Sequence, residues 1–218
     1  MTVTKWIWLL MGIIYTTFFI WYTSFEGPIT QEEMERYLDS ASRMHGFSSQ
    51  DNISNLREFM ENDSGDDFVM INIGHLYDEP LLIEGVTPGE TSQEVQSKYM
   101  EYMFPAMLRR ASHPMFMGKA ASPRAFDAIN VDGLETWSGF AGVRYRSRRD
   151  LMDIVLNPKF DGVHKLKVAS IAKSIAFPID PFSHLGDPRL LLALLFSLIG
   201  CVVGWYYSND HRSVSLEN

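Results

Sequence analysis

Two long apolar runs lie near the two ends of the chain, and a sequence of mixed polarity separates them. Residues 6–22 read WIWLLMGIIYTTFFIWY, and residues 190–207 read LLLALLFSLIGCVVGWYY. Neither run contains a charged residue, and each ends in aromatic residues. Runs of this length and composition are typical of transmembrane helices with interfacial aromatic side chains. We therefore predict transmembrane helices within residues 1–23 and 181–208, followed by a C-terminal tail over 209–218.

The apolar runs leave two alternatives open. A secretory signal peptide would also explain the first run, although the TSFEG that follows offers no small-x-small cleavage site. In the second run, Gly200 and Gly204 form a GxxxG pattern with Ser197 one turn earlier. Small residues at this spacing let helices approach closely, so the pattern indicates dimerisation or packing on the first helix. The alternative is that it has no role, because glycine is frequent in membrane helices.

The middle of the chain changes from a helical pattern to a mixed one. Residues 24–66 predict a helical linker, in which Thr30 and Glu33 form a capping box for a helix to Met44 and a second helix covers 48–62. Within residues 67–180, a strand over 68–77 is predicted first, followed by a helix after Thr91 that Pro105 kinks or interrupts. Two strands follow, over 113–121 and 137–146, and a turn-rich excursion over 123–135 separates them. Helical residues 147–173 and a strand over 174–179 complete the region.

The order strand, helix, strand, strand, helix, strand predicts an α+β domain of the ferredoxin-like βαββαβ type over residues 67–180. Such a domain has a four-stranded antiparallel sheet with helices on one face. The opposite face also needs a cover, and the chain has no second sheet to supply it. We therefore expect a symmetric homodimer that closes a shared α/β barrel.

Charge and cysteine content exclude several classes of protein. The net charge of -8 argues against nucleic acid as a partner, because phosphate binding needs a basic surface. The charge is uneven, with 4 basic and 17 acidic residues over 24–104 and 12 basic and 8 acidic residues over 105–188. Cys201 is the only cysteine, so no intramolecular disulfide or cysteine-based zinc site can form. With no phosphate-binding glycine loop and no HExxH, we expect neither a cofactor nor a metal.

The charges that flank the first apolar run indicate an orientation. Lys5 precedes the run, whereas the residues just after it are acidic. The positive-inside tendency then places both termini on the cytoplasmic side and the middle domain on the other. The prediction is an integral protein of a bacterial inner membrane, in contact with lipid, with a periplasmic domain.

Three segments together resemble a known superfamily: FVMINIGHL at 68–76, YMEYMFPAMLRRASHPMFMGKA at 99–120 and WSGFAGVRYRSRRDLMDIVLNPKFDGVHKLKVASIAKSIAFP at 137–178. They are similar to a family of small uncharacterised proteins in the dimeric α/β-barrel superfamily, which includes antibiotic-biosynthesis monooxygenases. The shared signs are VMxNI, VxYxSR, an Asn-Pro pair before an aromatic residue, and a following histidine. The resemblance implies a homodimer with a cleft between sheet and helices, and it implies no single reaction.

The candidates for chemistry are His164, His113, Asn72 and Arg144. Either histidine can act as an acid or a base near neutral pH. The resemblance places His164 at the helix histidine of the family and Asn72 at its first-strand asparagine. The structural alternative is that His164 bonds a backbone group and Arg144 pairs with an acid.

Four arginines crowd into six residues of the stretch VRYRSRRDLMDIVLNPKF, residues 143–160. We interpret the stretch as a strand-to-helix corner rather than a polyanion site. Arg148 and Arg149 fall in the first helical turn, where the helix dipole disfavours positive charge. Acids of the front half, in this chain or in a dimer mate, are therefore their expected partners. Arg144 and Arg146 then remain as candidates for a ligand.

Two functions are consistent with these patterns, and whether the protein is an enzyme stays open. The favoured hypothesis is a membrane-anchored dimer that serves as an accessory or structural subunit of a larger assembly of membrane proteins. The alternative is a membrane-tethered enzyme, similar to a cofactor-free monooxygenase, or a binding protein for a small apolar molecule. A cleft open to a ligand would favour the alternative.

Overall fold

The computed structural model describes residues 3–44, 50–122, 124–127, 129–130, 136–181 and 184–214, with side chains described through Tyr207. The chain divides into two compact units. One comprises Met1–Thr23 with Phe182–Asn218, and the other comprises Ser24–Pro181.

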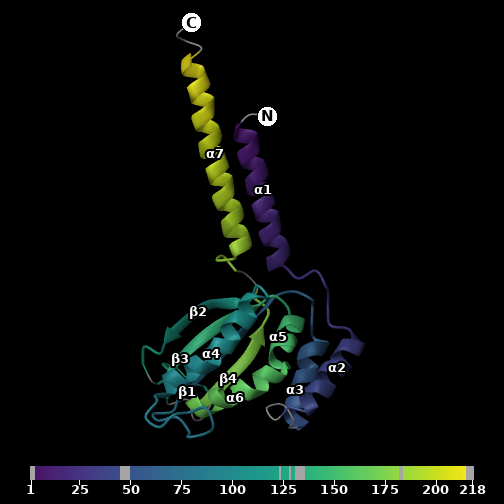
Figure 1. The fold of residues 1–218 in the computed structure, drawn as a ribbon, viewed down its shortest axis with the longest axis vertical. Helices are drawn as coiled ribbons and strands as arrows, with labels where there is room; N and C mark the ends of the chain where they lie inside the picture. The colour runs from purple at the N-terminus through teal and green to yellow at the C-terminus, as the bar shows by residue number, and fades with distance from the viewer. Residues whose placement is uncertain are drawn as a thin grey trace. The chain divides into compact units, whose positions relative to one another are not determined.

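The central unit is built on one sheet, which contains β1 Phe68–Leu76, β2 His113–Lys119, β3 Gly139–Tyr145 and β4 Ile171–Ile179. Its strands lie in the order β2-β3-β1-β4, and every neighbouring pair is antiparallel (Figure 1). This arrangement confirms the predicted α+β class and the four-stranded antiparallel sheet. The turn-rich excursion expected over 123–135 lies partly outside the described residues.

The helices of this unit are α2 Gln31–Ser42, α3 Gln50–Glu61, α4 Ser92–Leu108, α5 Arg148–Val155 and α6 Pro158–Ser170. The two capping boxes predicted at Thr30 and Thr91 are confirmed, each threonine accepting a hydrogen bond from the backbone of the glutamate three residues on. Each glutamate in turn accepts from the backbone of its threonine. The local sequence therefore determines where α2 and α4 begin.

The structure excludes the interruption at Pro105 and corrects one predicted helix end. α4 continues through Pro105 to Leu108, and the Arg109 N–H still bonds the Pro105 carbonyl at 3.1 Å. Helical structure was also expected through residue 173, but α6 ends at Ser170 and β4 begins at Ile171. The residues of β4 pair with β1 from Ile171 onward, so sheet pairing overrides their helical pattern.

The helices cover one face of the sheet. α4 and α6 lie side by side across it, with α5 beside them (Figure 1). Their buried side chains form one core with Phe68 of β1 and Tyr145 of β3, whose rings stack at 5.5 Å. Met34, Leu38 and Met60 of α2 and α3 belong to the same core, so these two helices are packed parts of the unit.

The opposite face of the sheet is apolar and remains exposed. The register pairs Ile71 with Phe177 and Ile73 with Ile175, so these side chains share a face. We call this surface the open face. Its large apolar side chains are 37% to 45% exposed, and they are Phe116, Phe140, Ile175, Phe177 and Ile179. An apolar surface of this kind usually marks an interaction site.

The arginine-rich corner is held within the chain. Arg149 pairs with Glu33 of α2 at 2.9 Å, and Arg148 lies 3.6 Å from Asp63. Both partners belong to the acidic front half, as predicted. Arg146 pairs with Asp150 at 2.6 Å, so the corner is a network of internal ion pairs.

The second unit contains α1 Val3–Tyr22 and α7 Pro188–Val214, which lie side by side (Figure 1). α1 and the Pro188–Tyr207 part of α7 are long and apolar enough to cross a membrane, by length and composition alone. Gly200 lies against the Trp8 ring, where any added side chain would collide, whereas the Thr4 methyl group lies 3.8 Å from the place of a Cβ at Gly204. The Ser197 hydroxyl donates to the Ala193 carbonyl within α7.

Candidate functional site

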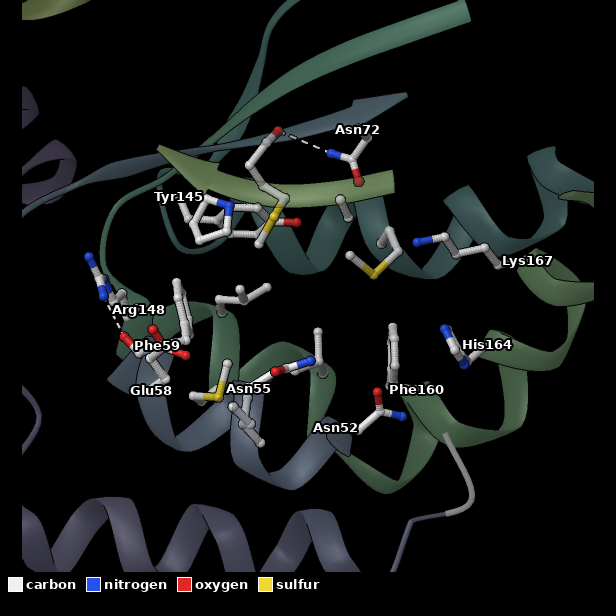
Figure 2. Close-up of a pocket in the computed structure, with 18 of the residues that line it drawn as sticks. Asn52, Asn55, Glu58, Phe59, Asn72, Tyr145, Arg148, Phe160, His164 and Lys167 are labelled. Carbon is white, nitrogen blue, oxygen red and sulfur yellow. Dashed lines mark hydrogen bonds between the residues drawn. The ribbon is translucent and has the colours of Figure 1, made fainter. Parts of the chain in front are cut away.

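A pocket of about 740 Å³ lies between the sheet and the helices of the central unit. β1, β3 and β4 supply one wall, and α3, α4, α5 and α6 supply the others (Figure 2). The wall is mostly apolar, with side chains such as Met103, Leu151, Met152 and Phe160. Pockets of this size and character suit small organic molecules.

Helix α6 places a pair of basic side chains on the pocket. His164 and Lys167 are three residues apart, so they lie on the same helical face. The His164 ring stacks on Phe160 at 5.0 Å, and the Lys167 ammonium lies 5.9 Å from the centre of the Tyr99 ring. Figure 2 shows the Lys167 amine directed into the pocket and His164 beside it.

Burial changes the protonation of both groups. Removal from water lowers the pKa of Lys167 below its ordinary value. Burial also lowers the pKa of His164, and the Lys167 charge lowers it further. His164 is therefore a neutral imidazole at pH 7, which is the form that can accept a proton.

The Lys167 ammonium has no ion pair and no hydrogen bond to any residue that the structure describes. The neighbouring lysine of α6, Lys165, lies outside this pocket and pairs with Glu84 at 2.6 Å. A half-buried ammonium without an anion is energetically costly unless another group compensates it. Lys167 is therefore a positive charge on the pocket wall that has no anion among the described residues.

The sheet contributes polar groups to the same pocket. The Asn72 amide donates to the Met70 carbonyl at 3.0 Å, and Figure 2 shows its side-chain oxygen on the pocket side. The hydroxyl-bearing rings of Tyr99 and Tyr145 also line the pocket, and burial raises the pKa of both phenols. Both therefore remain neutral at physiological pH and can donate a hydrogen bond.

Arg148 lies at another part of the pocket wall and is already paired. Its guanidinium donates to the Phe59 carbonyl and lies 3.6 Å from Asp63 and 3.3 Å from Asp180. It also stacks over the Phe59 ring at 4.8 Å. The charge of Arg148 is thus compensated within the chain, in contrast to that of Lys167.

The four sequence-based candidates separate into two groups. His164 and Asn72 both line the pocket. Arg144 is 1% exposed, and it donates to Asp67 at 2.6 Å and to the Ala111 carbonyl at 2.8 Å, away from the pocket. His113 of β2 pairs in register with Arg144 of β3, and its ring contacts the Pro114 carbonyl. The site role of each residue stays a prediction.

Lys167 and the two tyrosines were missed by sequence reasoning. Spacing could have identified Lys167, because it is one helical turn after His164. Nothing local marks Tyr99 or Tyr145, since aromatic residues at such positions usually belong to a core. In the part of the chain that the structure describes, no cluster of three or more His, Cys, Asp or Glu side chains could hold a metal ion.

No protein-family model matches the chain, and no curated protein matches its sequence. Solved structures of similar shape include a protein of unknown function from Rhodopseudomonas palustris, with 18% identity and a TM-score of 0.47 over 60% of this chain and 94% of that one. A dimeric protein of unknown function and ferredoxin-like fold from Bacteroides fragilis has 14% identity and a TM-score of 0.32 over 53% and 96%. SnoaB, a cofactor-independent oxygenase from Streptomyces nogalater, has 9% identity and a TM-score of 0.34 over 56% and 99%.

Proposed function

We propose that the protein is a membrane-tethered binding protein for a small, mostly apolar molecule, which occupies the pocket between sheet and helices. The observation that carries the proposal is the pocket itself, an apolar space of about 740 Å³ onto which His164, Asn72 and Lys167 converge. A protein whose only task is to dock on a larger assembly needs no such space. The accessory-subunit hypothesis stays a prediction that the same experiment tests.

Native mass spectrometry of the full chain, released from membranes in mild detergent, tests the proposal. We expect a bound small molecule on the unaltered chain. Ala176 lines the pocket, so Ala176→Trp fills the space and should abolish the adduct. Leu82→Trp is the matched control, because Leu82 is 70% exposed and lies outside the pocket, and it should retain the adduct. An unliganded chain in complex with larger membrane subunits would instead support the accessory role.

Catalysis on the bound molecule is a second candidate, and the neutral imidazole of His164 favours it. A buried neutral histidine can take a proton from a bound C–H or O–H group. We expect His164→Gln to carry a molecule that differs from the one on the unaltered chain in mass or, for an isomerisation, in fragmentation spectrum, since substrate would then accumulate. The same mass and the same fragmentation spectrum on both chains would leave binding as the function.

The proposed assembly is a homodimer through the open sheet face. Sheets of this class must bury both faces, and the helices cover only one. A second copy would place Phe140 and Phe177 against equivalent apolar residues. Such a symmetric contact would remove the exposed apolar surface of both copies at once.

The proposed location is a bacterial inner membrane, with lipid around α1 and the apolar part of α7. Both termini would lie in the cytoplasm and the central unit in the periplasm. The support is the charge difference across α1, with Lys5 in its first turn and acidic Glu26 after its end. Modification of Leu82→Cys in intact cells by an impermeant maleimide would test the orientation, and labelling only after lysis would contradict it.

A further inference from the structure

The ammonium group of Lys167 allows the ligand class to be narrowed. The group points into a largely apolar pocket, and no described carboxylate, carbonyl or hydroxyl group compensates it. The chain has other ways to satisfy a lysine near this place, since Lys165 reaches Glu84. A charge left unpaired beside an empty space indicates that the missing anion arrives with the ligand.

We propose that the pocket binds an amphiphilic monocarboxylic acid, whose carboxylate pairs with Lys167 and whose apolar body fills the space toward Leu151 and Met152. This inference rests on the proposed function and adds the charge and shape of the ligand. The pairing would exchange an isolated buried ammonium for a charge-assisted hydrogen bond.

The groups around Lys167 fit one carboxylate rather than a larger anion. The Tyr99 and Tyr145 hydroxyls are neutral donors with no hydrogen bond to any described residue, and both line the pocket with Lys167. The second cation on the wall, Arg148, is engaged by Asp63 and Asp180. A single unpaired positive charge therefore matches a single negative charge.

The remainder of the pocket fits an apolar body. Met103, Val155, Phe160 and Pro178 line it without any charge. The side chains that α3 adds to the wall include the neutral Asn52 and Asn55 and the acidic Glu58. Figure 2 shows Glu58 at the Arg148 end of the wall, away from Lys167. A polar acid such as a sugar acid would leave its hydroxyl groups without partners along the apolar walls, which is costly.

Photo-crosslinking with matched ligands tests the inference. The probes are a ten-carbon fatty acid with a diazirine near the end of its chain, and the alcohol of the same chain, each added to the purified full chain in mild detergent. Labelled peptides are mapped by mass spectrometry, and half-saturation concentrations are compared. In the unaltered chain we expect the acid to label pocket peptides at about a tenfold lower concentration than the alcohol, the difference of one charge-assisted hydrogen bond.

Variants at Lys167 isolate the charge. Lys167→Met removes the ammonium group and keeps an unbranched side chain as far as Cε. It should raise the half-saturation concentration of the acid about tenfold while leaving that of the alcohol within about twofold. Lys165→Met is the control on the same helix and should change neither. Circular dichroism spectra would confirm that each variant is folded, and the comparison of acid with alcohol in the unaltered chain needs no variant.

The outcomes separate this inference from the proposed function. Equal labelling by acid and alcohol in the unaltered chain, or unchanged acid labelling in Lys167→Met, would overturn the carboxylate assignment and leave pocket binding intact. If neither probe labels pocket peptides and native mass spectrometry finds no small molecule on the chain, both the carboxylate assignment and the proposed binding function are overturned.

Discussion

The contact between Arg149 and Glu33 holds the segment before α2 against the arginine-rich corner. Arg149 donates to the two Glu33 carboxylate oxygens at 2.9 and 3.0 Å. It also donates to the Gly27 and Pro28 carbonyls, each at 3.2 Å. We predict that Arg149→Met releases this segment while the sheet stays folded, because the other arginines of the corner keep their partners.

The magnitude follows from the titration of Glu33. The hydrogen bonds from Arg149, with a second contribution from the Thr30 backbone, lower the pKa of Glu33 from 4.5 to about 2. At about 1.4 kcal/mol per pKa unit, this net lowering corresponds to about 3.5 kcal/mol for all contacts of the carboxylate together, with burial acting against the hydrogen bonds. Glu33 is 21% exposed, so solvent screening reduces the share of the pair with Arg149 to about 1–2 kcal/mol.

Hydrogen–deuterium exchange of the full chain in detergent measures this energy locally. Arg149→Met should raise the opening constant of α2 amides by about tenfold, and the double variant with Glu33→Gln should add little to either single change. Arg57→Met is the control, because its pair with Glu35 is largely exposed, and it should change exchange by less than about twofold.

The stabilisation that Glu33 contributes should decrease as the pH falls. Because the pKa of Glu33 is lowered in the folded state, its contribution is complete above pH 4.5 and is lost as the pH falls through about 2. The difference between the unaltered chain and Arg149→Met should therefore be constant from pH 7 to pH 5 and should vanish toward pH 2. Unchanged α2 protection in Arg149→Met at pH 7, or strictly additive single changes, would refute the reasoning.

Three further changes have expected outcomes. Gly200→Leu forces a side chain into the Trp8 ring and should cost about 1–3 kcal/mol of packing between α1 and α7, seen as a fall in the thermal midpoint in detergent. Phe177→Asp places a charge on the open sheet face and should convert the proposed dimer into a monomer in light scattering. Asp67→Asn leaves the buried Arg144 guanidinium without its anion and should lower the free energy of unfolding by about 2–4 kcal/mol in chemical denaturation.

Each of these changes has a matched control in the chain. Gly204→Ala adds a methyl group where the nearest atom is 3.8 Å away and should be tolerated. Leu82→Asp changes an exposed apolar residue away from the open face and should leave the oligomeric state unaltered. Asp66→Asn alters the exposed neighbour of Asp67. A control that behaves like its test variant would contradict the contact assigned to that position.

The pattern of the sequence predicted the fold class because the signals were local. Each capping box combines a threonine with a glutamate three residues later, and this spacing is sufficient to start a helix. A short apolar run bounded by turn residues marked β1, and alternating side chains marked β3. The boundary between α6 and β4 could not be predicted in this way, because the extended backbone at Ile171 depends on pairing with Leu76, which is far away in the sequence.

The candidate site was predictable only in part. His164 and Asn72 came from the resemblance, and both line the pocket. Lys167 differs from Lys165 only in the direction that α6 gives its side chain, and composition does not encode that direction. Arg144 looked chemically similar to a ligand-binding arginine, yet its partners Asp67 and Ala111 belong to two other parts of the chain, so tertiary structure alone reveals that it is engaged.

The contrast between the two cations of the pocket connects the site to the proposed tether. A chain that satisfies Arg148 with Asp63 and Asp180 has the means to neutralise a buried charge, so the uncompensated Lys167 calls for a functional explanation. An amphiphilic acid dissolves in lipid and carries the required anion. Two helices long and apolar enough to cross a membrane would keep a binding unit beside such a reservoir, where the local concentration of the acid exceeds that in water. On this argument the apolar helices and the lysine would serve one task, because the helices would bring the pocket to the ligand and Lys167 would select it by charge.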